Sequence, residues 1–303
     1  MGFARHVSFR GIALLSLWAV ASIATAGCDR GPGTSQTSTP REPVNVIAVA
    51  YPMADVVRQI GGDRVHVEWL LESGQPIDSF EPDESQKNRL GTADLVVSGG
   101  FDEPWAIEGF DDPTHGARVI RLDLLQTART SPNAVAQLWL DPLIVRESAQ
   151  TMADRLRALR PGGDAVFQRN ANTFTTQIDS MLMDYRPKLD ALAGQKVITL
   201  SPAFSALTSR FGIVELRPVS ASPLKLSDLE VARIRRTARA QNIGVMLVDD
   251  DDVSPQVAQD LADRTGLRVI TLDSLGTSAK AGNGNSDYFK LLRYNLEQLI
   301  RIR

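Results

Sequence analysis

The chain of 303 residues is 43% hydrophobic, 23% charged and 6% aromatic, a composition typical of soluble globular proteins. Its net charge of −3 argues against nucleic acid as a partner, because nucleic-acid-binding proteins carry a basic footprint. A single cysteine excludes a disulfide framework and any cysteine-rich zinc or iron–sulfur site.

The first 27 residues have the pattern of an export signal peptide. Arg5 and Arg10 precede an apolar run, and small residues then lead to Cys28, the sole cysteine. The apolar stretch at residues 12–26 is shorter than the roughly 20 residues of a membrane-spanning helix. The tetrapeptide Thr-Ala-Gly-Cys at residues 25–28 resembles the lipobox of bacterial lipoproteins, in which the cysteine is lipidated. The alternative is ordinary signal cleavage, which leaves Cys28 as a free thiol.

Residues 28–43 are rich in glycine, proline, serine and threonine, and we expect them to form a disordered tether. Together with the signal, this segment predicts a protein outside the cytoplasm that a lipid anchor on Cys28 holds at the membrane. Removing the signal leaves 276 residues, a length that favours two lobes.

In the rest of the chain, short β-branched runs alternate with amphipathic helical stretches. The candidate strands are residues 44–50, 64–69, 94–98 and 117–122 in the first half, and 196–200, 213–217, 245–248 and 267–272 in the second. Strands that are separated by helices predict an α/β fold with mainly parallel sheets.

The longest helical pattern lies between the two halves. Six residues recur at spacings of three and four, as on one face of a helix: Phe167, Ala171, Phe174, Ile178, Met181 and Tyr185. A preceding helix has the same spacing from Val145 to Leu159, and Pro187 predicts a kink or a frayed end in the long helix. We expect an N-terminal lobe at residues 44–162, a connecting helix at 163–193 and a C-terminal lobe at 194–303.

Several motifs follow one another in the order found in a known family. They are YPMADVVRQIGGDRV at residues 51–65, FEP at 80–82, EPW at 103–105, WLDP at 139–142, SPAF at 201–204 and LDSLG at 272–276. This series resembles the metal-binding periplasmic solute-binding proteins, the extracytoplasmic receptors of zinc and manganese ABC importers. The resemblance covers residues 44–302. It implies two pseudo-symmetric α/β lobes bridged by one long helix, with a metal ion held between them.

The resemblance also implies four metal-ligand positions, which fall on Asp78, Gln137, Ser201 and Asp273. The family has a histidine at the first and second positions, a histidine or glutamate at the third and an aspartate at the fourth, so only Asp273 matches. The four residues offer oxygen donors alone, which suit manganese, magnesium or calcium, whereas zinc prefers imidazole and thiolate. Three interpretations stay open: an altered cation site, a zinc site, or a family member that has lost metal and holds another solute or a partner protein.

Residues elsewhere offer little to replace the missing histidines. His66 alternates with valines on a predicted strand, and His115 lies in a turn-like segment, so we expect a strand-face and an exposed loop residue. The run Asp249-Asp250-Asp251-Asp252 either adds a cation ligand or forms a solvated loop before a helix that begins at Ser254-Pro255.

Enzymatic functions find no support in the sequence. Ser201 lacks a G-x-S-x-G elbow, and no phosphate-binding glycine motif follows a strand. We therefore expect a binding protein rather than an enzyme. The resemblance implies an ABC permease in the membrane as its partner and a zinc or manganese ion as its cargo, and we expect the chain to act as a monomer.

Overall fold

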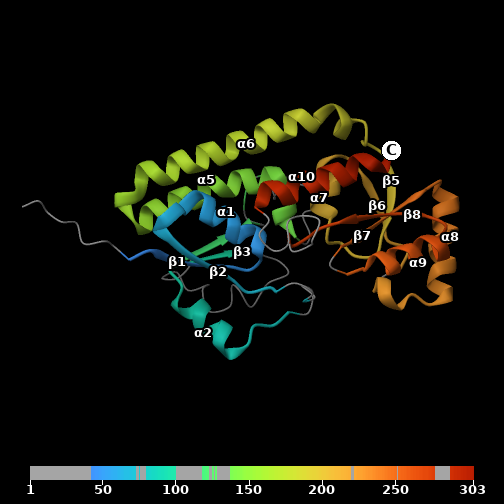
Figure 1. Cartoon of the computed structure of the whole chain (residues 1–303), viewed down its shortest axis with the longest axis horizontal. Coiled ribbons are helices and arrows are strands. Elements are labelled where there is room, and N and C mark those ends of the chain that lie inside the picture. The colour runs from blue at the N-terminus through green and yellow to red at the C-terminus, as the bar shows by residue number, and fades with distance from the viewer. Residues whose placement is uncertain are drawn as a thin grey trace, which may run out of the picture. The chain divides into compact units, whose positions relative to one another are not determined.

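The structure is a computed structural model, and it describes residues 42–72, 75, 80–99, 118–122, 125, 127, 137–219, 222–250, 252–276 and 287–303 (Figure 1). Of the features singled out above, the signal, Cys28 and the tether up to residue 41 lie outside these ranges, as do Asp78, the EPW motif at residues 103–105, His115 and Asp251. Within the described ranges, no helix combines the length and the apolar character that a membrane crossing requires.

The first sheet has four parallel strands in the order β2-β1-β3-β4. They are β1 (Val44–Ala48), β2 (Val65–Trp69), β3 (Leu95–Ser98) and β4 (Val119–Arg121). Helix α1 (Tyr51–Gly61) connects β1 to β2, and α2 (Glu84–Thr92) precedes β3. The central strands β1 and β3 are almost wholly buried, as expected for parallel strands that are covered on both faces.

The second sheet repeats this topology, with the parallel order β6-β5-β7-β8. Its strands are β5 (Lys196–Thr199), β6 (Val214–Leu216), β7 (Val245–Asp249) and β8 (Arg268–Leu272). Its helices are α7 (Ser205–Arg210), α8 (Asp228–Gln241), α9 (Pro255–Thr265) and α10 (Tyr288–Leu299). In each sheet the first strand of the chain pairs with the second and the third, so the predicted pseudo-symmetric α/β fold is confirmed.

Two long helices lie between the sheets in the chain, α5 (Pro142–Leu159) and α6 (Asp164–Asp190) (Figure 1). The carboxylate of Asp141 caps α5 by accepting hydrogen bonds from the N–H groups of Leu143 and Ile144, at 2.9 and 3.4 Å. Helix α6 has 27 residues, about 40 Å of helix, and packs against α1, α5 and α10. It therefore contacts helices of both halves of the chain.

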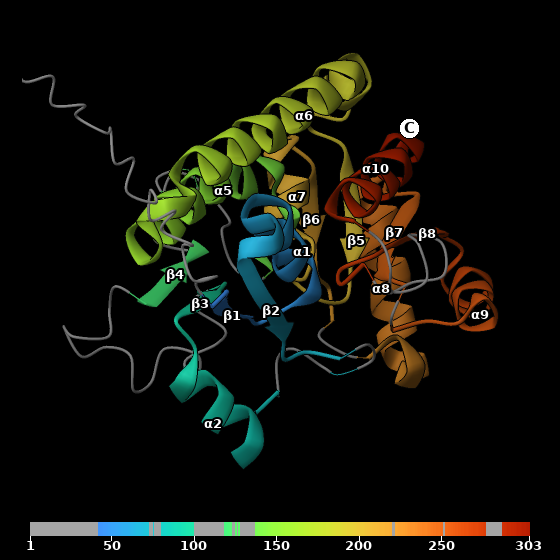
Figure 2. The ribbon, with the colours of Figure 1, turned by 60° about the vertical axis from the view of Figure 1, so that its left-hand side comes forward.

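The hydrophobic core is shared between the halves. One cluster joins Val46 and Val97 of the first sheet, Ile178 of α6, and Val245 and Leu247 of β7. The alternate residues of β7, Met246 and Val248, belong to a second cluster with residues of α8 and α9. Because successive side chains of a strand point to opposite faces, α8 and α9 cover one face of the second sheet and the shared core covers the other (Figure 2).

Pro187 lies inside α6, three residues before the helix ends at Asp190. Two expectations need correction. Leu159 is 43% exposed, since it is the last residue of α5. The aspartate run is only partly solvated: Asp249 is the buried final residue of β7, and Asp252 is exposed. Ser254 caps α9 and Pro255 begins it, as predicted.

Candidate functional site

Gln137 has the most unusual environment of the predicted ligand residues. It precedes the short helix η5 (Leu138–Leu140) with φ 41° and ψ 53°, in the left-handed region that non-glycine residues rarely adopt. Gln137 is 9% exposed, and its Oε1 atom is buried with no hydrogen-bond partner among the described residues. A buried acceptor without a donor costs about 1–3 kcal/mol, and strained backbone concentrates at functional sites. Both features are typical of a residue that serves binding and does not stabilise the fold.

Asp273 lies directly after β8, and its side chain is fully buried. Its Oδ1 atom accepts hydrogen bonds from the N–H groups of Leu275 at 3.0 Å and Gly276 at 2.6 Å. Gly276 has φ 72°, so glycine suits this turn. Asn295 of α10 holds the Asp273 backbone, accepting from its N–H at 2.9 Å and donating to its carbonyl at 2.7 Å. The Asp273 carboxylate is therefore held in a fixed position.

Ser201 occupies the loop between β5 and α7 and is half-buried. Its Oγ atom accepts a hydrogen bond from the N–H of Ala203 at 3.2 Å. Because β5 and β8 are parallel, Ser201 and Asp273 both follow the carboxyl edge of the second sheet. Strands β5 and β8 are two strand spacings, or about 10 Å, apart in the sheet. Ligands of open α/β sheets bind at this edge.

Contacts between elements bring η5, the short helix directly after Gln137, beside the loops that follow this edge. The indole Nε1 of Trp139 donates to the carbonyl of Ser274 at 2.8 Å, which ties η5 to the residue after Asp273. The hydroxyl of Tyr288 donates to the carbonyl of Trp139 at 3.2 Å, and η5 also packs against α7, the helix after Ser201. Three of the four predicted ligand residues thus lie on adjoining elements, whereas Asp78 lies outside the described residues.

A sequence model of one protein family, described as zinc-uptake complex component A, periplasmic, matches residues 46–302. The chain belongs to this family. The family is a substrate-binding component of ABC transporters and not an enzyme, as the sequence predicts.

Two curated relatives of this zinc-uptake component A family are similar over almost their whole length. The high-affinity zinc uptake system protein ZnuA of Bacillus subtilis is 20% identical over 90% of this chain and 92% of its own. The manganese ABC transporter substrate-binding lipoprotein PsaA of Streptococcus pneumoniae is 22% identical over 92% and 94%. Among solved structures, the Zn(II)-bound ZnuA-like domain of Streptococcus pneumoniae AdcA has a TM-score of 0.71 at 20% identity, over 86% of this chain and 98% of its own. The resemblance predicted from the motifs is confirmed.

An ion pair joins the WLDP motif of this zinc-uptake component A chain to its second half. Asp141 is fully buried, and its two carboxylate oxygens accept from Nε and Nη2 of Arg210, on α7, at 2.7–3.0 Å. Asp141 lies four residues after Gln137, but Arg210 already engages both of its carboxylate oxygens. We therefore assign Asp141 a structural role. Sequence reasoning missed the pair, because 69 residues separate its two members and neither motif indicates its partner.

Two partly buried carboxyl groups also escaped sequence analysis. Burial raises the pKa of Glu215 on β6, which accepts from the hydroxyls of Ser205 and Thr208 at 2.7 and 2.8 Å. Burial likewise raises the pKa of Asp55 on α1, which accepts from the N–H of Tyr288 at 2.8 Å. These contacts fix α7 to β6 and α1 to α10.

The described histidine does not contribute to the site. His66 is exposed on β2, as expected, with its Nε2 atom 3.4 Å from the Glu68 carboxylate. Among the described residues, no three histidine, cysteine, aspartate or glutamate side chains group closely enough to hold a metal ion. Any cation site built from these residues therefore needs neutral oxygen donors such as Gln137.

Proposed function

We propose that this chain is the extracytoplasmic solute-binding receptor of an ABC importer and that its cargo is a divalent metal ion. The family assignment supports the receptor role. Relatives named for zinc and for manganese support a divalent ion as the cargo. In this role the chain binds the ion outside the membrane and delivers it to the importer's permease.

We propose that Asp78, Gln137, Ser201 and Asp273 hold the ion through oxygen donors. Two carboxylates, an amide carbonyl and a hydroxyl favour manganese over zinc, since hard cations prefer oxygen ligands and complete their coordination with water. The unpartnered Oε1 atom of Gln137 carries this proposal. A bound cation would give this buried oxygen the partner that the described protein groups do not supply.

The tethering of the receptor is the second part of the proposal. The lipobox-like residues 25–28 and the polar segment 28–43 support a lipid anchor on Cys28 that keeps a monomeric receptor beside its permease. Fully extended, the 14 residues from Asp29 to Glu42 reach about 50 Å, so the anchor confines the receptor to the neighbourhood of the membrane.

One alternative deserves the same test. A family member that has lost metal would hold another solute or a partner protein with the same residues. In its favour, the described residues contain no cluster of three charged or thiolate ligands, and backbone N–H groups already stabilise the Asp273 carboxylate. On this alternative the chain responds to no metal.

The test is thermal unfolding of tag-free, chelator-stripped mature protein with Mn²⁺, Zn²⁺, Mg²⁺ or Ca²⁺ at 1 mM free ion. A ligand that binds only the folded state raises the melting temperature. We expect Mn²⁺ to raise it more than Zn²⁺. No shift with any of the four ions would contradict the metal proposal and favour the alternative.

Gln137→Met is the most informative variant. Methionine keeps the volume of glutamine but removes the buried, unpartnered oxygen, so the metal-free variant should be as stable as the wild type or more stable. The Mn²⁺ shift should be largely lost. His66→Gln, which removes an exposed imidazole, is the control and should keep the full shift. Asp273→Ala is less informative, because it also removes two hydrogen bonds that fold its own turn.

A further inference from the structure

Helix α8 segregates its charges along its length. Its two acidic residues, Asp228 and Glu230, lie in the first turn, and four arginines follow: Arg233, Arg235, Arg236 and Arg239. From Ala232 to the end of the helix there is no acidic residue. Acidic residues near the N-terminus and Arg239 in the last turn favour the helix dipole. The dipole acts only within the terminal turns, so it does not explain Arg235 and Arg236.

The arginines in the second half of α8 are exposed and lack counter-charges. Among the described residues, the side chains of Arg235, Arg236 and Arg239 form no ion pair or hydrogen bond. Arg235 and Arg239 are four residues apart, so two like charges face each other on neighbouring turns. Such a pair destabilises a helix by about 0.2–0.5 kcal/mol. A single glutamate in this half of α8 would relieve the repulsion between the arginine side chains, but the sequence has none there.

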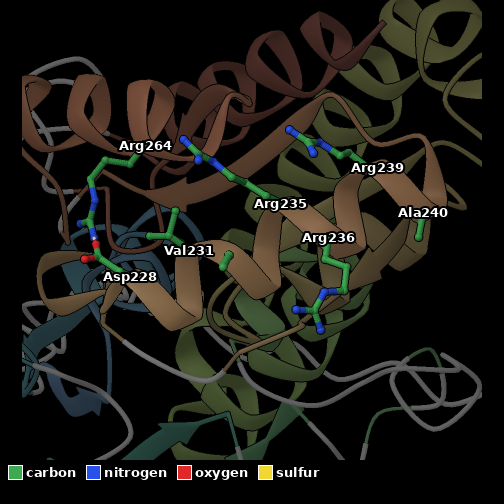
Figure 3. Close-up of a pocket in the computed structure, with 8 residues that line it drawn as sticks. Asp228, Val231, Arg235, Arg236, Arg239, Ala240 and Arg264 are labelled. Carbon is green, nitrogen blue, oxygen red and sulfur yellow. The ribbon is translucent and has the colours of Figure 1, made fainter.

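These arginines line a groove of about 840 Å³. Figure 3 shows Arg235 and Arg239 extending on the same side of α8, while Arg236 points to the other side. At one end of the groove, Arg264 of α9 contacts the carboxylate of Asp228 at 3.4 Å. The small side chains of Ala232 and Ala240 complete the lining.

We propose that this groove, which we call the arginine groove, binds phosphate-type anions. Two guanidinium groups one helical turn apart provide forked donors that match phosphate oxygens, and arginine keeps its charge at every physiological pH. Aromatic side chains provide much of the binding energy of protein–protein interfaces. None of the eight residues that line the groove is aromatic. A compact, highly charged ligand therefore fits better than a protein segment. The phosphate belongs either to the headgroup of an anionic phospholipid or to a soluble polyphosphate.

The experiment measures binding of both phosphate sources to the mature chain carrying Cys28→Ser, which removes the acylation site. A chelator is present throughout, so the outcome does not depend on the metal proposal. At fixed ionic strength, tripolyphosphate is titrated in thermal unfolding, and vesicles of phosphatidylglycerol or of phosphatidylcholine are used in sedimentation. We expect tripolyphosphate to raise the melting temperature by about 2–4 °C, or phosphatidylglycerol vesicles alone to sediment the protein. The probe that binds identifies the source.

The variants Arg235→Gln and Arg239→Gln should each weaken binding at least about tenfold, because each removes a charge-assisted contact. Without anion they should melt at the wild-type temperature or slightly above it, since they relieve like-charge repulsion. Arg233→Gln is the matched control: it removes an exposed arginine of α8 that interacts with Glu230, and it should bind as the wild type does. Equal binding by all variants, or binding to neither phosphate source, would overturn the proposal.

Discussion

Replacing Arg210 by glutamine should destabilise the protein strongly, because it leaves a buried carboxylate without its counter-charge. Asp141 is fully buried and receives three contacts of 2.7–3.0 Å from Arg210. Breaking a buried ion pair by removing one partner costs about 3–5 kcal/mol. The Arg210 side chain is 23% exposed, so water reaches the site in part and the lower end, about 3 kcal/mol, is expected.

A loss of about 3 kcal/mol corresponds to a fall in melting temperature of about 6–12 °C. Urea unfolding and calorimetry of wild type and variant measure both quantities. Arg146→Gln is the matched control, since Arg146 forms a bidentate pair with Asp179 at 2.7 and 2.9 Å. Both members of that pair are almost half exposed, so its loss should cost less than about 1 kcal/mol. If the two variants lost equal stability, the structural role assigned to Asp141 and Arg210 would be wrong.

Three further predictions concern single buried groups. Because burial raises the pKa of Glu215, the folded state loses stability as the pH rises from the ordinary value of 4.5 through the raised one. The free energy of unfolding of Glu215→Gln, measured with urea, should therefore rise relative to that of the wild type as the pH increases across that window. A difference in stability that does not change with pH would contradict the prediction. Asn295→Leu removes the two hydrogen bonds that hold the N–H and carbonyl of Asp273, which should cost about 2–4 kcal/mol and reduce stabilisation by Mn²⁺. Trp139→Phe leaves the Ser274 carbonyl without its donor and should cost about 1–3 kcal/mol; an unchanged urea midpoint would argue against that contact.

The strands and helices were predictable because they depend on local patterns. The wholly apolar run of β7 reflects a strand that is covered on both faces, and the three-four spacing from Phe167 to Tyr185 reflects one buried face of α6. The order of the motifs was sufficient to predict the family.

The contacts that build the site were not predictable, because they join residues that are distant in the chain. Nothing near Asp141 in the sequence indicates Arg210, and nothing near Asp273 indicates that Asn295 holds its backbone. The left-handed backbone of Gln137, and an Oε1 atom with no partner among the described residues, likewise leave no local signal in the sequence. The sequence could indicate which residues fall on the candidate metal-ligand positions. Only the fold reveals which of their oxygen atoms already accept hydrogen bonds.

Anomalous scattering from crystals grown with manganese tests the central proposal most directly. We expect one strong anomalous peak within coordination distance of Gln137 Oε1 and the Asp273 carboxylate, with Ser201 and Asp78 completing the protein ligands. Crystals with no peak at millimolar Mn²⁺, or with a peak remote from both Gln137 and Asp273, would contradict a cation receptor that uses oxygen donors in place of histidines.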